Sequence, residues 1–115
     1  MQTQATAQPR RASPPPNQPL STFEATIQRL VRQDGRDLSL RQLAVLLILG
    51  RRPIEECTVR GIALMLDVSK PAVCRAFDRL CENGLMHRRE DRFDRRSVQG
   101  ELTPAGRAYV DGVAA

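Results

Sequence analysis

Residues 58–106 read TVRGIALMLDVSKPAVCRAFDRLCENGLMHRREDRFDRRSVQGELTPAG, and most of the fold prediction depends on them. Thr58 and Ser69 each precede a run with apolar side chains at helical spacing, so each is predicted to be the N-cap of a helix. Pro71 then falls in the first turn of the second helix, where a missing amide costs little. Asp67-Val68 lies between the two runs and predicts a turn. These residues therefore predict two short helices joined by a tight turn.

The rest of this segment predicts two strands and a further helix. Asn83-Gly84 suits the end of the second helix. Residues 85–90 and 97–102 read as strands on either side of a charged tip at 91–96, and Thr103-Pro104 predicts the start of a last helix. Helix, turn, helix, strand, loop, strand and helix is the order of a winged helix-turn-helix. We therefore expect a mainly α protein with a small β-wing, an α+β fold.

Two more helices are predicted before this segment. Residues 21–24 (STFE) and 39–42 (SLRQ) each match the capping box that starts a helix. The second of these helices is apolar on most sides from residue 43 to residue 49, so it is expected in the middle of the core. Residues 1–20 are polar and rich in proline, and we expect a disordered tail there, followed by a folded domain at 21–115.

The charge balance favours a polyanionic partner. The chain has 115 residues, with 18 basic against 13 acidic ones and a formal net charge of +5. Its isoelectric point is about 10.1. Lys70 is the single lysine, and arginine forks suit phosphates and guanine edges better than lysine does. A genome rich in G and C would produce the same arginine excess, so composition agrees with nucleic-acid binding without proving it.

Other classes of function find little support in the sequence. Cys57, Cys74 and Cys81 lack paired metal spacing and His87 is the single histidine, so we expect no metal site and reduced thiols packed as small hydrophobic residues. No nucleophile stands near a plausible base and no glycine-rich phosphate loop is present, so we expect neither an enzyme nor a bound cofactor. The longest apolar run, 43–49, is too short to cross a membrane, and we expect a cytoplasmic protein.

The predicted helix that follows Ser69 carries residues expected to contact DNA. Ser69 and Lys70 stand at its start, where backbone amides attract phosphate. Arg75 and Arg79 lie one turn apart on its exposed face, and each has the length to reach guanine O6 and N7 in a major groove. The alternative for both arginines is an ion pair in solvent with a neighbouring acidic residue of the same helix.

The charged tip carries a second set of cations. Arg95 and Arg96 are long enough to enter a minor groove, and Asp94 is expected to pair with Arg96. The nearby arginines, Arg88 among them, are expected to bind phosphate or water. A generic charged hairpin is the alternative. The residues predicted to contact double-stranded DNA are, together, Ser69, Lys70, Ala72, Arg75, Arg79, Arg89, Arg92, Asp94, Arg95 and Arg96.

Between Leu38 and Tyr109 the sequence resembles the MarR family of bacterial winged-helix regulators. LSLRQLAVLLIL at 38–49 is similar to the family's second helix, and DVSKPAVCRAFDRLCENGLMHR at 67–88 to its turn, recognition helix and first wing strand. DRR at 94–96, followed by LT at 102–103 and Gly106, fits its wing. The resemblance implies a sequence-specific transcriptional regulator, more often a repressor, with the recognition helix in the major groove and one wing arginine in the minor groove.

The sequence also departs from the family pattern. Gly61 replaces a helix-favouring polar residue, and Gly100 replaces a β-branched one, which predicts a bulged or mobile wing. The sequence stops at Ala115, before most of the C-terminal helices through which the family dimerises. The resemblance then implies a homodimer formed by the first helix and the residues after Thr103. The sequence gives no independent evidence for a small-molecule effector pocket. The competing hypothesis is an adaptor whose winged helix binds a protein, with little or no specific DNA binding.

Overall fold

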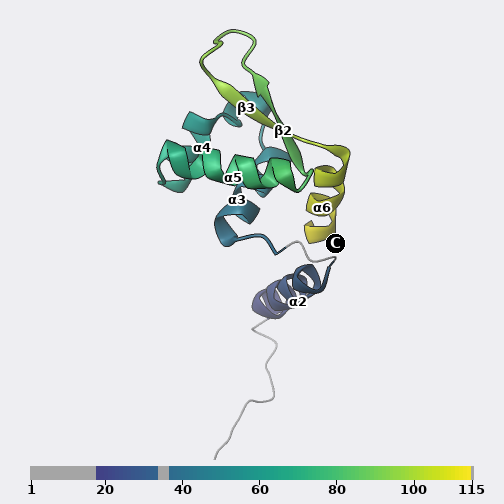
Figure 1. Ribbon diagram of the computed structural model, residues 1–115. Helices are drawn as coiled ribbons and strands as arrows, with labels where there is room; N and C mark the ends of the chain where they lie inside the picture. The colour runs from purple at the N-terminus through teal and green to yellow at the C-terminus, as the bar shows by residue number, and fades with distance from the viewer. Residues whose placement is uncertain (1–17, 34–36, 115) are drawn as a thin grey trace, which may run out of the picture. The chain divides into compact units, whose positions relative to one another are not determined.

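The computed structural model describes residues 18–33 and 37–114 (Figure 1). In chain order the elements are α2 (Gln18–Arg32), α3 (Leu40–Arg51), the 3₁₀ turn η2 (Ile54–Glu56), α4 (Val59–Leu66), α5 (Lys70–Glu82), β2 (Met86–Glu90), β3 (Val98–Leu102) and α6 (Pro104–Ala114). The predicted winged helix-turn-helix order, mainly α with a small β-wing, is confirmed. Of the expected disordered tail, residues 1–17 lie outside the described residues.

The first helix begins earlier than the sequence pattern predicted. Ser21 was expected as an N-cap, but α2 already includes Gln18, so Ser21 lies inside the helix. Pro19 occupies the first turn of α2, where its missing amide leaves no helical hydrogen bond unmade. The chain divides after Gly35 into two units. α2 is the described helix of the first unit and carries Phe23, Ile27 and Leu30 on one face.

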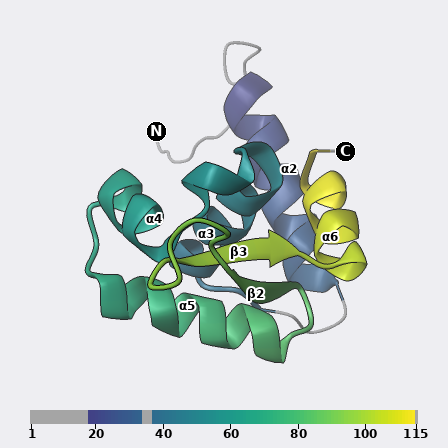
Figure 2. The same ribbon diagram turned by 90° about the horizontal axis from the view of Figure 1, so that it is seen from above.

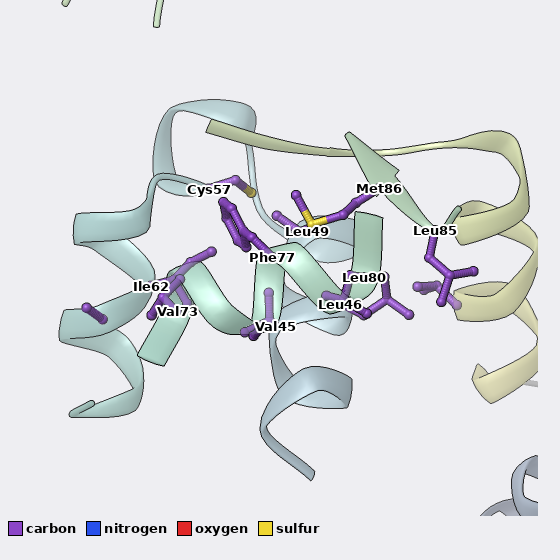
Figure 3. Packing of buried hydrophobic residues seen from close by; sticks show 13 residues of the cluster. Val45, Leu46, Leu49, Cys57, Ile62, Val73, Phe77, Leu80, Leu85 and Met86 are labelled. Atoms are coloured by element: carbon purple, nitrogen blue, oxygen red, sulfur yellow. The ribbon is translucent and has the colours of Figure 1, made fainter. Parts of the chain in front are cut away.

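Helix α3 runs through the core of the second unit, as predicted. Its capping box is present: the Ser39 hydroxyl accepts a hydrogen bond from the Gln42 amide at 3.1 Å, and the Gln42 side chain accepts one from the Ser39 amide at 3.0 Å. Val45 and Leu46 are fully buried. Figure 3 shows them among the buried side chains of α5, with Phe77 at the centre of the cluster.

The helix-turn-helix consists of α4 and α5. Thr58 Oγ1 accepts a hydrogen bond from the Gly61 amide at 2.9 Å, and Ser69 Oγ accepts one from the Ala72 amide at 3.2 Å, so both predicted caps are confirmed. Asp67 adopts the left-handed conformation (φ 56°, ψ 48°) that turns the chain between the helices. A Cβ at Gly61 would lie 3.0 Å from the Glu56 carbonyl oxygen, so this glycine permits close packing at the start of α4.

The two strands form a regular antiparallel ladder. Arg88 lies opposite Gly100, and the register continues without interruption from Met86 to Glu90. The bulge predicted at Gly100 is therefore wrong. A Cβ at Gly100 would lie 3.0 Å from side-chain atoms of Leu49, Met86 and Phe77, which explains the glycine by close packing instead. The Gly100 amide also donates to the Cys57 carbonyl at 2.8 Å, which ties β3 to the segment before α4.

Helix α6 is fixed to the wing by its first turn. Thr103 Oγ1 accepts a hydrogen bond from the Gly106 amide at 3.0 Å, as a predicted N-cap should, and donates one to the Gly84 carbonyl at 2.6 Å. Gly106 and Val110 are the buried residues of α6. Arg107 donates to the Gly50 carbonyl at 3.2 Å, so α6 also contacts the end of α3.

The three cysteines are free thiols in different environments. Cys57 is buried in the core and its thiol donates toward the Pro53 carbonyl at 3.4 Å. Burial raises the pKa of the Cys57 thiol, and the nearby Glu56 carboxylate raises it further. Cys81 is half-buried and Cys74 is exposed. The expectation that all three pack as hydrophobic residues is therefore wrong for Cys74, because it lies on the solvent side of amphipathic α5.

Candidate nucleic-acid interface

Helix α5 presents a cationic face because its large apolar side chains are buried in the core. Val73, Phe77 and Leu80 are fully buried, and the opposite face exposes Lys70, Arg75 and Arg79. Ala72, which the sequence placed among the DNA contacts, is only 6% exposed and its amide is held by Ser69. Its side chain therefore offers little to an outside partner.

The wing tip at 91–97 is closed by its own backbone. The Asp91 amide donates to the Ser97 carbonyl at 3.0 Å, and the Ser97 amide donates to the Asp94 carbonyl at 2.9 Å. Asp94 Oδ1 accepts a hydrogen bond from the Arg96 amide at 3.0 Å and lies 3.8 Å from Arg96 Nε, so the predicted Asp94–Arg96 pair is present. The Arg96 side chain is 95% exposed. The tip projects beyond the helices of the second unit in Figure 1, and Arg92, Arg95 and Arg96 are exposed.

The wing and the helix-turn-helix meet at one hollow surface, which we call the basic groove. It has a volume of about 620 Å³ and is lined by the start of α4, the first two turns of α5 and the returning side of the wing. Arg60, Lys70 and Arg96 supply its positive charge, and Cys74 and Asp94 also line it. Cations from segments far apart in the sequence therefore lie around a common groove.

Arg60 is a residue that the sequence analysis missed. It is exposed at the second position of α4 and lines the basic groove together with wing residues. The sequence places Arg60 two residues after the cap residue Thr58. It does not place Arg60 near Arg96, because their closeness in space depends on the packing of the wing against α4.

Arg88 has partners within the protein that the sequence did not predict. Its Nη2 lies 2.6 Å from Asp78 Oδ1 and 3.3 Å from the Cys74 carbonyl, and its guanidinium lies 5.6 Å from the centre of the Phe77 ring. The expectation that Arg88 binds phosphate or water stays a prediction, because the Arg88–Asp78 pair is itself exposed to solvent. Arg88 joins β2 to α5, since a guanidinium satisfies an acid, a carbonyl and an aromatic face at once.

The remaining predicted cations differ in their partners. Arg79 pairs with Glu82 at 3.4 Å, which is the solvent-exposed alternative considered from the sequence. Arg89 pairs across the wing with Glu101 at 3.3 Å, and Glu101 also contacts His87 at 2.9 Å. Such exposed pairs contribute little and leave an arginine available to a stronger anion. In the described part of the chain, no ion pair or hydrogen bond is formed by the side chains of four predicted contacts, Lys70, Arg75, Arg92 and Arg95.

The described residues form neither a metal site nor a membrane-spanning helix. Within residues 18–33 and 37–114, no three His, Cys, Asp or Glu side chains gather closely enough to hold a metal ion. None of the helices in that part of the chain combines the length and the apolar character that a membrane crossing requires.

Comparison with known proteins gives a consistent result. A model of the MarR family matches residues 36–97. FabT of Streptococcus pneumoniae in complex with DNA is similar in structure with a TM-score of 0.66 and 22% identity, over 83% of this chain and 68% of FabT. The MepR–DNA complex of S. aureus gives a TM-score of 0.70 at 22% identity, over 83% and 75% of the two chains.

A probable transcriptional regulator from Pseudomonas aeruginosa is also similar, with a TM-score of 0.64 and 25% identity over 83% of this chain and 70% of that one. The curated proteins contain no significant match to the sequence. The structural similarities agree on the fold, which is the winged helix-turn-helix described above.

Proposed function

Because this chain belongs to the MarR family, we propose that it is a sequence-specific double-stranded DNA-binding transcriptional regulator. The observation that supports this best is the basic groove, which Arg60 and Lys70 of the helix-turn-helix line together with Arg96 of the wing. A duplex presents phosphates on both sides of each groove, so it can neutralise cations that converge from two segments. Both FabT and MepR have been solved with DNA.

In the proposed complex α5 enters the major groove and the wing enters the adjacent minor groove. The N-terminal half of such a helix reaches the base edges, which assigns Arg75 to guanine and Lys70 to phosphate. At the wing tip we propose that one of Arg95 and Arg96 inserts into the minor groove while the other contacts the backbone. Arg79 and Arg89 join as phosphate contacts once DNA displaces their exposed carboxylate partners.

We further propose that the chain acts as a homodimer and as a repressor. Dimers of helix-turn-helix proteins bind two half-sites about one helical turn apart, so that the operator has the symmetry of the protein. The apolar residues of α2, which include the exposed Leu20 and Phe23, support a role for this helix in the dimer, together with the residues after Thr103. Light scattering at micromolar concentration tests the dimer, and a promoter fusion in cells tests the sign of regulation.

The DNA-binding proposal is tested by titrating a labelled fragment of the protein's own promoter and following fluorescence anisotropy. If several phosphates are neutralised, the affinity falls by orders of magnitude between about 50 and 200 mM salt. An unrelated fragment of equal length measures the non-specific affinity. Binding that is independent of salt, or equal for both fragments at every salt concentration, contradicts the proposal.

Arg75→Gln and Arg107→Gln form a matched pair of variants because each removes one positive charge. Arg107 lies on α6, at the end of α5 that is remote from α4 (Figure 2). Arg75→Gln should weaken specific binding by about 1–3 kcal/mol and relax the sequence preference, whereas Arg107→Gln should leave the preference unchanged. If DNA binding survives both Arg75→Gln and the double change Arg95→Ala with Arg96→Ala, the adaptor hypothesis is favoured instead.

A further inference from the structure

Phe93 occupies the wing tip with its aromatic ring in solvent. It is 93% exposed, more than any other large hydrophobic residue in the described part of the chain. Exposure of an aromatic ring to water is unfavourable, so a partner that covers the ring with a flat apolar surface is bound more tightly. Helix packing cannot provide that surface, because the tip projects away from the core (Figure 1).

The tip holds Phe93 in a defined place. The Phe93 amide donates to Asp91 Oδ1 at 2.9 Å, inside the loop closed by the two Asp–Ser backbone hydrogen bonds. Asp91 and Asp94 both direct a carboxylate oxygen at the tip's own amides. The two carboxylates therefore hold the backbone of the loop, and the Phe93 ring is left exposed to a partner.

The charges around Phe93 restrict what that partner can be. Arg92, Arg95 and Arg96 lie within three residues of Phe93 in the sequence and are exposed. A second copy of the same tip would bring like charges together, and an uncharged apolar protein surface would leave the arginines unpaired and partly desolvated. A duplex satisfies both requirements, because its minor groove is bordered by phosphates and the flat faces of its bases become accessible where a step is partly unstacked.

We propose that Phe93 enters the minor groove beside the tip arginines and wedges against a base-pair step. This inference rests on the proposed DNA-binding function and adds a deformation of the DNA to it. Apolar wedges of this kind partly unstack the step they touch and bend the duplex toward the major groove. Flexible pyrimidine–purine steps deform most readily, so Phe93 selects for such a step without a hydrogen bond to any base.

The test uses the full chain and promoter duplexes carrying 2-aminopurine, whose fluorescence rises when it is unstacked, at each step under the wing. Wild-type protein should raise the fluorescence at one step. Phe93→Ala should abolish that rise and weaken binding by about 5-fold to 150-fold, the range found when an aromatic residue that stacks on a base is truncated. The slope of affinity against salt should not change, since Phe93 carries no charge.

Leu40→Ala is the matched control, because Leu40 is 81% exposed and lies at the start of α3, outside the wing. It should change neither the fluorescence nor the affinity. Thermal unfolding of Phe93→Ala should match the wild type, because so exposed a side chain contributes little to packing. Equal affinity of wild type and Phe93→Ala for DNA, with no unstacking, overturns the wedge while the proposed function stands.

Two other results are also decisive. If the wild type fails to bind any duplex, the proposed function is wrong and the wedge is excluded with it. An anionic membrane is the other surface that offers both negative charge and an apolar interior. Binding to vesicles of phosphatidylserine and phosphatidylcholine that depends on Phe93, without unstacking of DNA, overturns the wedge in favour of that partner.

Discussion

Gly106→Ala is predicted to destabilise the protein, although alanine is the better helix former. A Cβ built at Gly106 would lie 1.9 Å from the Leu85 carbonyl oxygen and 2.9 Å from its carbon. Real Cβ atoms essentially never approach a heavy atom closer than 3.0 Å, so α6 must shift away from the start of β2. The obstacle is backbone, which cannot rotate out of the way as a side chain can.

The size of the effect follows from the contacts that this shift disturbs. The Thr103 amide donates to the Leu85 carbonyl at 3.1 Å, and the Thr103 hydroxyl donates to the Gly84 carbonyl at 2.6 Å. Each such bond contributes about 1 kcal/mol, and overpacking at a buried site costs about 1–3 kcal/mol. The higher helix propensity of alanine offsets about 1 kcal/mol of this loss. The free energy of unfolding should therefore fall by about 2–4 kcal/mol.

Gly112→Ala provides the control within the same helix. A Cβ at Gly112 meets no heavy atom within 4 Å, so this substitution should stabilise the protein by up to about 1 kcal/mol. Urea unfolding followed by circular dichroism at 222 nm compares the variants, and the Gly106→Ala midpoint in a thermal scan should drop by about 10–25 °C. If Gly106→Ala is as stable as Gly112→Ala, the close approach of α6 to Leu85 is incorrect.

The contacts of Arg88 and the thiol of Cys57 lead to two further predictions. In urea unfolding, Asp78→Ala should lower the free energy of unfolding by less than about 1 kcal/mol, because the ion pair is exposed. Arg88→Ala should lower it further, because this variant also loses the contact with the Phe77 ring. Equal losses of stability in the two variants argue against the ring contact. The pKa of the Cys57 thiol is raised in the folded state above its ordinary value of 9.0. The stability that the buried neutral thiol provides is therefore fully present below pH 9.0 and is lost as the pH rises through the folded pKa. The free energy of unfolding of Cys57→Ala should therefore fall less at alkaline pH than that of the wild type. A thiol reagent at neutral pH should label the exposed Cys74 before the buried Cys57.

Local sequence was enough to predict where most helices of the second unit begin. Ser39, Thr58, Ser69 and Thr103 each cap a helix as predicted, because an N-cap acts on amides two or three residues away. The apolar spacing of α5 likewise identified its buried face. Ser21 failed as a cap because an equally short signal, Pro19 in a first turn, allowed α2 to begin earlier.

The order of these elements also predicted the fold class and the family, since a helix-turn-helix followed by an arginine-tipped hairpin is a long and specific pattern. It predicted that α5 and the wing both carry cations. It did not reveal that Arg60 and Arg96 border one groove, or that Arg88 is held by Asp78 within the protein.

The contacts that escaped prediction connect residues distant along the chain. Gly100 and Gly106 look like local helix or strand breakers, yet each is glycine because another segment passes within 3.0 Å of its absent Cβ. Arg88 looks like its neighbour Arg89, yet the strand alternation turns one toward α5 and the other toward Glu101. Helix caps and apolar periodicity depend on residues that are close in the chain, so the sequence is enough to predict them. The close approaches at Gly100 and Gly106 and the contact of Arg88 with α5 are set by the spacing between helices and sheet in the packed core.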